Sequence, residues 1–260
     1  MLITGASSGI GRELATLFAR DGHGLVLIAR DQASLARIGG ELTREYGVAV
    51  EVIAQDLSRP NAAIEIYREL KRLSIEIDVL VNNAGFGTYG VFADADPGIE
   101  LQMLQLNIVS LTQLTRLFLK EMLAKRDGKI LNVASTAAFQ PGPLMAVYYA
   151  SKAYVLSLSE ALANELRGSG VTVSTLCPGP TQTGFKRRAH MEDSRLFASG
   201  AMDAARVAAI GYRGLMRGKT VIIPGLKNRL LAFVVRFAPR RLVTSAVRML
   251  QDKESTPLPS

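Results

Sequence analysis

The sequence is poor in the residues that build disulfides and metal sites. Its 260 residues include one cysteine, Cys177, and two histidines, His23 and His190. A single cysteine excludes a disulfide within the chain, and two distant histidines form no cluster at metal-ligand spacing. We therefore predict no metal site, and the shortage of cysteine favours a reducing compartment.

Long hydrophobic runs are also missing. No apolar stretch approaches the ~20 residues that cross a bilayer, and no cationic segment followed by an apolar one opens the chain. We therefore expect a cytoplasmic protein. A glycine-rich turn begins at residue 5, which makes the first predicted strand short. For this reason we expect the natural start to lie a few residues upstream.

The positive charge is concentrated near the C-terminus. The net charge is +8, to which residues 186–248 contribute +11 through 14 Lys and Arg against three acidic residues, while the rest carries −3. A nucleic-acid binder could use such a segment, but the sequence shows no aromatic stacking pattern and no recognised nucleic-acid motif. We therefore expect no nucleic-acid partner.

Short apolar runs rich in β-branched residues alternate with longer amphipathic segments. They predict strands at residues 1–4, 24–29, 48–54, 77–81, 129–135, 171–176 and 220–223, and helices near 9–21, 31–46, 60–74, 97–126, 146–168 and 203–218. This alternation predicts an α/β fold, a single doubly wound, mainly parallel seven-stranded sheet with helices on both faces. We expect this domain to span residues 1–225 and a basic helical extension with a frayed tail to span 226–260.

The first strand runs into the glycine-rich segment TGASSGIG, residues 4–11, which is followed by an amphipathic helix. Glycine allows a tight strand-to-helix turn and lets a phosphate approach the backbone at the helix N-terminus, where free N–H groups carry a partial positive charge. A dinucleotide pyrophosphate suits such a turn. The spacing differs from the usual G-x-G-x-x-G pattern, so a plain glycine-rich corner is the alternative.

Several further motifs share one order along the chain. TGASSGIG is followed by NNAG at residues 82–85, Asn107, Ser135, YYASK at 148–152 and PGPTQT at 178–183. In order and approximate spacing, residues 1 to about 185 resemble the short-chain dehydrogenase/reductase family. The resemblance implies a Rossmann-like fold, hydride transfer between nicotinamide and a carbonyl or alcohol group, and a homodimer or homotetramer.

Two tyrosines, Tyr148 and Tyr149, precede Lys152 by four and three residues, and helical geometry alone places both near its ammonium. The family motif Y-x-x-x-K selects Tyr148, leaves Tyr149 as a packing or pocket residue, and implies a catalytic set of Ser135, Tyr148, Lys152 and Asn107. A tyrosine has a pKa of about 10, and a nearby ammonium and a bound nicotinamide cation both favour its phenolate. Ser135 would polarise the carbonyl, and Asn107 would sit in a helix distortion that anchors a proton-relaying water chain.

The resemblance also implies a set of residues that contact the cofactor. Asp56 would accept a hydrogen bond from the adenine, and Asn82 with its neighbours would line the ribose and brace the sheet. The full set is Gly5, Ser7, Gly9, Ile10, Gly11, Arg30, Asp56, Leu57, Asn83, Ala84, Gly85, Tyr148, Lys152, Pro178, Gly179, Thr181 and Thr183.

The end of the second predicted strand favours NADP over NAD. An NAD-selecting site needs a carboxylate there to bind both ribose hydroxyls, whereas this sequence has Ala29 and Arg30. A guanidinium pairs with a 2′-phosphate through two hydrogen bonds, and Ser7 could add a hydroxyl. Asp31 follows directly, but we expect it to cap the next helix.

The predicted substrate side is mostly apolar. Residues 86–92 and 137–147 contribute to it, and residues 184–202 form a predicted lid. Further apolar candidates are Phe185, Met191, Leu196, Phe197 and Met202. Such a lining suits a lipophilic carbonyl or alcohol, although each of these residues could also be ordinary core.

A nucleotide sensor without catalysis is the alternative function, but it would not need Ser135, Tyr148 and Lys152 together.

The extension carries Arg229, Arg236 and Arg240 at spacings that place them on one stripe of a helix, among mostly apolar residues. A cationic amphipathic helix of this kind can lie on an anionic membrane surface, which predicts weak peripheral membrane contact. The alternative is a helix that packs on its own subunit or on a partner subunit, and Pro239 interrupts the pattern.

Overall fold

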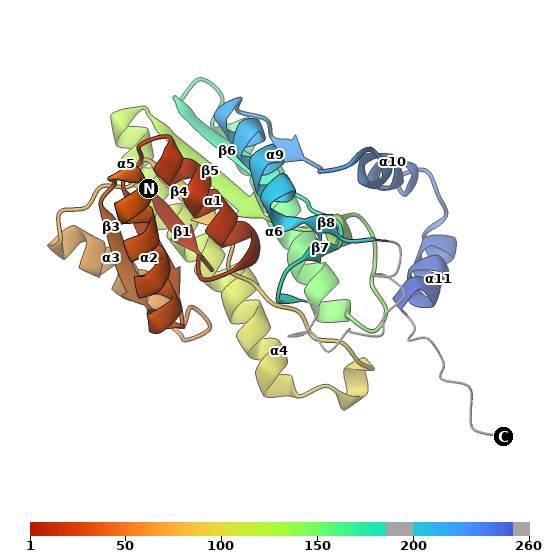
Figure 1. Ribbon diagram of the computed structural model, residues 1–260. Coiled ribbons are helices and arrows are strands. Elements are labelled where there is room, and N and C mark those ends of the chain that lie inside the picture. The colour runs from red at the N-terminus through yellow and green to blue at the C-terminus, as the bar shows by residue number, and fades with distance from the viewer. Residues whose placement is uncertain (186–199, 252–260) are drawn as a thin grey trace.

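The computed structural model describes residues 1–185 and 200–251, and Figure 1 traces the chain. The predicted lid, most of which falls at 186–199, and the predicted tail at 252–260 therefore lie largely outside the described residues. Met191, Leu196, Phe197 and His190 also lie outside them.

One sheet of seven parallel strands forms the centre, in the order β3-β2-β1-β4-β5-β6-β9. This confirms the predicted doubly wound α/β fold. The strands are β1 (Leu2–Thr4), β2 (Leu25–Ala29), β3 (Val50–Ala54), β4 (Val79–Asn82), β5 (Gly128–Val133), β6 (Val171–Leu176) and β9 (Val221–Ile222). A separate parallel pair, β7 (Thr181–Gln182) with β8 (Met202–Asp203), was not predicted from the sequence.

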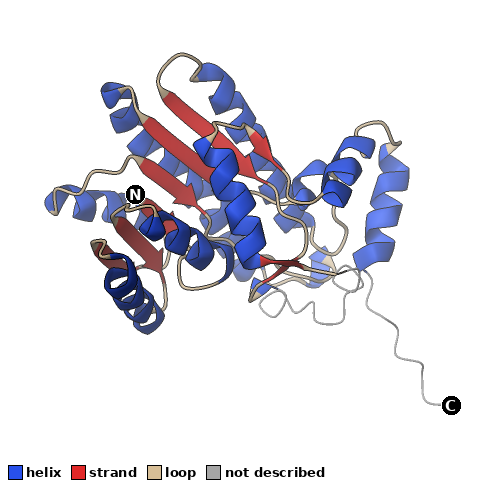
Figure 2. Cartoon of the chain, turned by 45° about the horizontal axis from the view of Figure 1, so that its top comes forward, coloured by secondary structure: helices blue, strands red, loops and turns tan. Residues whose placement is uncertain are grey.

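Helices cover both faces of the sheet, as Figure 2 shows. They are α1 (Gly9–Arg20), α2 (Gln32–Tyr46), α3 (Ala62–Arg72), α4 (Pro97–Leu104), α5 (Leu111–Lys125), α6 (Ala146–Glu165), α9 (Ala204–Met216), α10 (Leu226–Val234) and α11 (Arg240–Gln251). Three short helical segments join them: η1 (Phe92–Asp94), the π-helix η2 (Gln105–Ser110) and η3 (Thr136–Phe139). The helix predicted at 97–126 is thus α4, η2 and α5 in succession.

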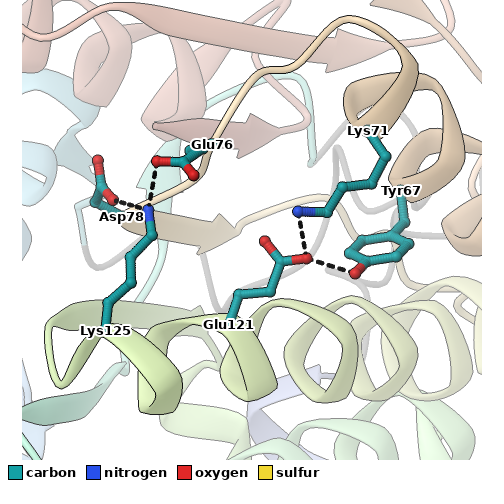
Figure 3. Close-up of polar contacts among 6 residues, drawn as sticks. All are labelled: Tyr67, Lys71, Glu76, Asp78, Glu121 and Lys125. Carbon is teal, nitrogen blue, oxygen red and sulfur yellow. Dashed lines mark hydrogen bonds and ion pairs between the residues drawn. The ribbon is translucent and has the colours of Figure 1, made fainter.

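Side chains alternate along each strand and so divide the core into two layers. In β1, Ile3 faces the cluster that contains α1, α2 and α9, whereas Leu2 faces the cluster that contains α3 and α5. Ion pairs support the second layer at its surface, where Glu121 of α5 accepts from Lys71 of α3 at 2.6 Å and from Tyr67 (Figure 3). Lys125 of α5 pairs with Glu76 and Asp78 before β4.

The C-terminal extension forms two helices rather than one. α10 ends at Val234 and α11 begins at Arg240, so Arg229, Arg236 and Arg240 do not share the single helical stripe that their spacing predicts. Pro239 separates the two helices because it has no N–H to continue a helix. α11 is tied to the body of the protein through its buried Val243 and Val247.

Candidate active site

A cavity of about 430 Å³ opens at the carboxyl ends of the strands, where open α/β sheets bind ligands. It runs from the glycine-rich turn to Ser135 and Tyr148. Of the predicted site residues, it is lined by Gly5, Ser7, Gly9, Ile10, Arg30, Asp56, Leu57, Asn83, Ala84, Gly85, Ser135, Tyr148, Lys152, Pro178, Gly179, Thr181 and Thr183. Gly11 and Asn107 are not among its lining residues.

The turn between β1 and α1 depends on its glycines. Gly5 and Gly9 have φ of 66° and 54°, a region that favours glycine. A Cβ on Gly11 would lie 2.4 Å from the carbonyl oxygen of Gly5 and 2.5 Å from Nδ2 of Asn83. Gly11 therefore allows α1 to approach the turn closely, while Gly5 and Gly9 border the cavity.

The two asparagines of NNAG have different contacts: Asn82 binds within the sheet and Asn83 binds the glycine-rich turn. Asn82 is buried and donates from Nδ2 to Asn132 at 2.9 Å and to Thr115 at 3.0 Å. It braces the sheet, as predicted, and does not line the cavity. Asn83 donates from Nδ2 to the carbonyl oxygens of Thr4 at 3.0 Å and Gly5 at 3.2 Å. Asn83 therefore holds the glycine-rich turn in place beside β4.

Ser135, Tyr148 and Lys152 meet at the inner end of the cavity. Ser135 directly follows Ala134 after the end of β5, and its hydroxyl accepts a hydrogen bond from the Ala137 N–H at 3.1 Å and lies close enough to Tyr148 to lower the pKa of that side chain. Lys152 lies one turn after Tyr148 on α6, with Nζ 5.8 Å from the centroid of the Tyr148 ring. The Lys152 ammonium donates to the carbonyl oxygen of Val133 at 2.9 Å. The buried ammonium of Lys152 is thus fixed against the end of β5, and the buried Tyr148 lies beside it.

Asn107 lies in the π-helix η2, which is the helix distortion that the resemblance implies. Its Nδ2 donates to the carbonyl oxygen of Phe86 at 3.0 Å and to Ser151 at 3.1 Å, and its Oδ1 accepts from the Phe86 N–H at 3.3 Å. Gly85 sits between Asn107 and Lys152, because a Cβ there would lie 3.0 Å and 3.3 Å from their polar atoms. The Asn107 side chain is therefore held directly behind the wall of the cavity.

Burial dominates the ionisation of this group. It lowers the pKa of Lys152 to about 8 and raises the pKa of Tyr148 above its usual value of 10.0, an effect that the nearby Ser135 hydroxyl opposes. The tyrosine therefore holds its proton at neutral pH, which is the form that donates a proton during a reduction. The sequence alone predicts a shift in the opposite direction, because a neighbouring ammonium and a nicotinamide cation favour the phenolate of Tyr148.

We expect the buried Lys152 to make the stability of the fold depend on pH. Its pKa is about 8 when folded and 10.5 when exposed, so between these values the unfolded chain binds more protons and the free energy of unfolding rises with pH. The rise should be about 3 kcal/mol, at ~1.4 kcal/mol per pKa unit. Denaturant titrations of the wild type and of Lys152→Met from pH 7.5 to 10.5 measure it as the difference between the two proteins.

The comparison with Lys152→Met is needed because Cys177 changes the pH dependence of stability in the opposite direction. Burial raises the pKa of its thiol to about 12, so the unfolded chain loses that proton first and stability falls above pH ~9. Both proteins contain Cys177, so most of this contribution cancels, and only the electrostatic interaction between Cys177 and Lys152 remains in the difference. Parallel pH profiles for the two proteins would show that Lys152 is not buried in this way.

Tyr149 makes a contact that the sequence did not predict. Its hydroxyl accepts a hydrogen bond of 2.5 Å from Nε2 of Gln251, at the end of α11. The Tyr149 ring also lines the cavity, with its centroid 6.0 Å from that of Tyr148. The predicted role of Tyr149 as a packing or pocket residue agrees with this position. No local pattern near Gln251 could have indicated the contact, which joins residues 102 positions apart.

Arg30 lines the outer part of the cavity, and its side chain is exposed. Asp31 caps α2, as predicted, and accepts from the Ser34 N–H at 3.0 Å and the Ser34 hydroxyl at 2.6 Å. Burial raises the pKa of Asp56, but the hydrogen bonds from Ser58 and the charges of Arg30 and Arg59 outweigh burial, so the pKa of Asp56 lies below its ordinary value. This outer part of the cavity therefore contains the ionised carboxylate of Asp56 and the guanidinium of Arg30.

Within residues 1–185 and 200–251, no three His, Cys, Asp or Glu side chains form a group that could hold a metal ion. Among the helices of the same residues, none is long and apolar enough to cross a membrane.

Comparisons with known proteins identify the family. The model of the short chain dehydrogenases matches residues 1–193. The chain is 38% identical over 183 residues to the uncharacterized oxidoreductase YvrD of Bacillus subtilis, which covers 70% of this chain and 68% of that protein. It is 36% identical to the very-long-chain 3-oxoacyl-CoA reductase of Anas platyrhynchos and 37% identical to 17-beta-hydroxysteroid dehydrogenase type 3 of Mus musculus. Each of these matches covers 68% of this chain and 58% of the relative.

Solved structures agree over almost the whole chain. A short-chain dehydrogenase from Sphingobium yanoikuyae in complex with NADPH has a TM-score of 0.81 at 34% identity and covers 98% of both chains. The bulky-bulky ketone specific alcohol dehydrogenase from Comamonas testosteroni has a TM-score of 0.77 at 30% identity, over 99% of this chain and 98% of that one. A short chain dehydrogenase/reductase from Burkholderia phymatum in complex with NAD scores 0.79 at 27% identity, over 98% of this chain and 97% of that one. The chain therefore belongs to the short-chain dehydrogenase/reductase family of oxidoreductases.

Proposed function

We propose that this protein is an NADP(H)-dependent oxidoreductase that reduces a lipophilic ketone or a 3-oxoacyl substrate. The observation that carries the proposal is the single cavity that joins the glycine-rich turn to Ser135, Tyr148 and Lys152. The proposed catalytic unit is residues 1–225, and residues 226–260 extend it.

The residues of the cavity fit a nicotinamide dinucleotide. A Cβ on Gly9 would lie 2.9 Å from the side chain of Thr183, so the missing side chain of Gly9 lets Thr183 pack directly against the turn where the phosphates would bind. The N-terminus of α1 favours a negative charge there. Asp56 would accept from the adenine amino group, and Lys152 would bind the ribose hydroxyls. When bound, the cofactor supplies a hydride at nicotinamide C4.

The protein side chains supply the proton and the polarisation of the carbonyl. Ser135 would donate a hydrogen bond to the carbonyl oxygen of the substrate, and Tyr148 would give that oxygen its proton as the alcohol forms. The raised pKa of Tyr148 keeps the proton available near neutrality. Asn107 would anchor a water chain that returns a proton to Tyr148 through Lys152. Burial of this group excludes water and strengthens each interaction.

The cofactor preference rests on Arg30. Among the described residues, the acids that line the cavity are Asp31 and Asp56. Asp31 is engaged with Ser34 as a helix cap, so Arg30 is the charged side chain at the end of β2 that can meet a 2′-phosphate. Ser7 would add a hydroxyl to the same phosphate. These contacts favour NADP over NAD.

The lipophilic substrate class rests on the apolar end of the cavity. Phe86, Met145, Tyr149 and Phe185 line it near Tyr148, and the ring of Phe185 lies 5.2 Å from that of Tyr148. Relatives named for 3-oxoacyl-CoA, steroid and bulky ketone substrates support the same class.

A homodimer or homotetramer is also proposed, formed through the long helices, where Val109, Leu123 and Tyr154 are exposed apolar side chains.

A carbonyl panel tests the proposal. Purified protein with NADPH is mixed with bulky aryl ketones, steroid ketones, 3-oxoacyl thioesters and acetone, and the loss of NADPH absorbance is followed. We expect kcat/KM for at least one lipophilic compound to exceed that for acetone by more than about tenfold, because buried methylenes each contribute to binding. Tight NADPH binding with no oxidation by any compound would instead identify a nucleotide sensor.

A further inference from the structure

The C-terminal part of the described chain has an unusual charge. From residue 204 to residue 251 the sequence contains ten Lys and Arg and no Asp or Glu. Within it, α10 and α11 lie beyond the β9 edge of the sheet, as Figures 1 and 2 show. Any partner that covers these two helices therefore meets positive charge.

The same helices expose large apolar side chains. On α10, Leu226, Leu230 and Phe233 follow spacings of four and three residues and so share one face. They are 80%, 60% and 59% exposed. Phe237 continues this stripe in the turn after α10, with its ring 5.1 Å from that of Phe233. A stripe this exposed is unusual for a monomeric protein and marks a binding surface.

A cationic cavity lies beside this stripe. Its volume is about 410 Å³, and its cationic lining comes from α9, α10 and the segments that follow them: Arg213, Arg217, Lys219, Arg229 and Arg236. The other described residues that line it are neutral. Among the described residues, none of these five cations takes part in an ion pair. Five unpaired cations around one hollow form a site for a phosphate-bearing group.

We propose that this surface, which we term the α10–α11 face, docks on membranes that contain anionic phospholipids. The cavity takes the phosphate of a lipid headgroup, and the apolar stripe of α10 enters the interface between headgroups and acyl chains. On α11, Leu242, Met249 and Leu250 are more than half exposed and extend the apolar surface. This inference does not depend on the proposed reaction.

Charge distinguishes the membrane from a second copy of the chain. A symmetric dimer through this face would bring two cationic cavities together, and like charges across an interface oppose association. A soluble phosphate would satisfy the cavity but would leave the apolar stripe exposed. An anionic bilayer is complementary to both features.

Vesicle flotation at low salt tests the proposal with the full-length chain. We expect binding to phosphatidylcholine vesicles that contain phosphatidylglycerol and none to phosphatidylcholine alone. Each basic residue near such a surface contributes about fivefold in affinity, so Arg229→Gln with Arg236→Gln should weaken binding about thirtyfold. Raising the salt concentration should have a similar effect. A variant with Leu230→Ser and Phe237→Ser should also bind more weakly.

A matched control removes two exposed cations elsewhere, Arg44→Gln with Arg68→Gln, and should bind as the wild type does. Thermal unfolding checks that each variant is folded. If both arginine double variants lost the same amount of vesicle binding, net charge alone would explain the binding, and the proposal would be overturned. Absence of binding by the wild type, or a dimer that Leu230→Ser with Phe237→Ser converts to monomers, would also overturn it.

Discussion

Tyr148→Phe is expected to reduce kcat by about a thousandfold or more while NADPH affinity changes only a few-fold. General acid catalysis contributes ~10²- to 10⁴-fold, and this variant lacks the hydroxyl that would protonate the substrate oxygen. The ring would still pack against Phe185 and Tyr149. Steady-state turnover with a ketone from the panel, together with a fluorescence titration of NADPH, measures both quantities.

Tyr149→Phe is the matched control, because it removes a hydroxyl from the neighbouring ring of the same cavity. It loses the hydrogen bond from Gln251, so we expect a modest loss of stability, about 1 kcal/mol, with most of the activity retained. If Tyr149→Phe abolished turnover and Tyr148→Phe did not, the assignment of the two tyrosines would be reversed.

Arg30→Ala is expected to weaken NADPH binding by about tenfold to a hundredfold and to leave NADH binding nearly unchanged. A charge-assisted pair with the 2′-phosphate contributes ~1.5 to 3 kcal/mol, and NADH lacks that phosphate. Isothermal titration with both cofactors measures the two changes. The exposed position of Arg30 makes a change of fold improbable on physical grounds.

Arg59→Ala provides the control for Arg30. The charge of Arg59, like that of Arg30, lowers the pKa of Asp56, but Arg59 does not line the cavity. We expect Arg59→Ala to change the affinity for neither cofactor by more than about twofold, since salt screens the charge of an exposed side chain that does not line the cavity. An equal loss of NADPH and NADH binding in Arg30→Ala would exclude a role in recognising the 2′-phosphate.

The sequence predicts the sheet well because its strands carry strong local signals. β2, with the sequence LVLIA, is almost fully buried and is bounded by turn residues, so its pattern admits few other structures. The cap of α2 by Asp31 was also predictable, because the side chain and the N–H groups that it binds are close in sequence.

Contacts between distant segments were not predictable in the same way. The pair of β7 and β8 joins Thr181 to Met202 through strands of two residues each, too short for a pattern to show. Gln251 reaches Tyr149 from the end of α11, where the packing of Val243 and Val247 and a hydrogen bond from the Tyr89 hydroxyl to the Gln251 carbonyl oxygen hold it. Such contacts depend on tertiary packing, which periodicity does not encode.

Motif matching alone did not separate residues that line the site from residues that hold it. Gly11 belongs to the glycine-rich motif, but the structure places it under the turn against Gly5 and Asn83. Asn107 lies behind the cavity wall and is fastened to Phe86 and Ser151. Their roles toward the cofactor and the water chain stay predictions. Burial was the physical factor that the sequence could not supply, because it depends on elements from the whole chain.

The transfer of a labelled hydride tests the central claim most directly. NADPH carrying deuterium at nicotinamide C4 is incubated with the protein and a ketone from the panel, and the product is analysed by mass spectrometry and NMR. The cavity geometry predicts an alcohol with deuterium on the former carbonyl carbon, formed as NADPH is consumed, with one face of the nicotinamide supplying the label. If the protein binds NADPH but no carbonyl compound acquires deuterium, the protein is not the reductase proposed here.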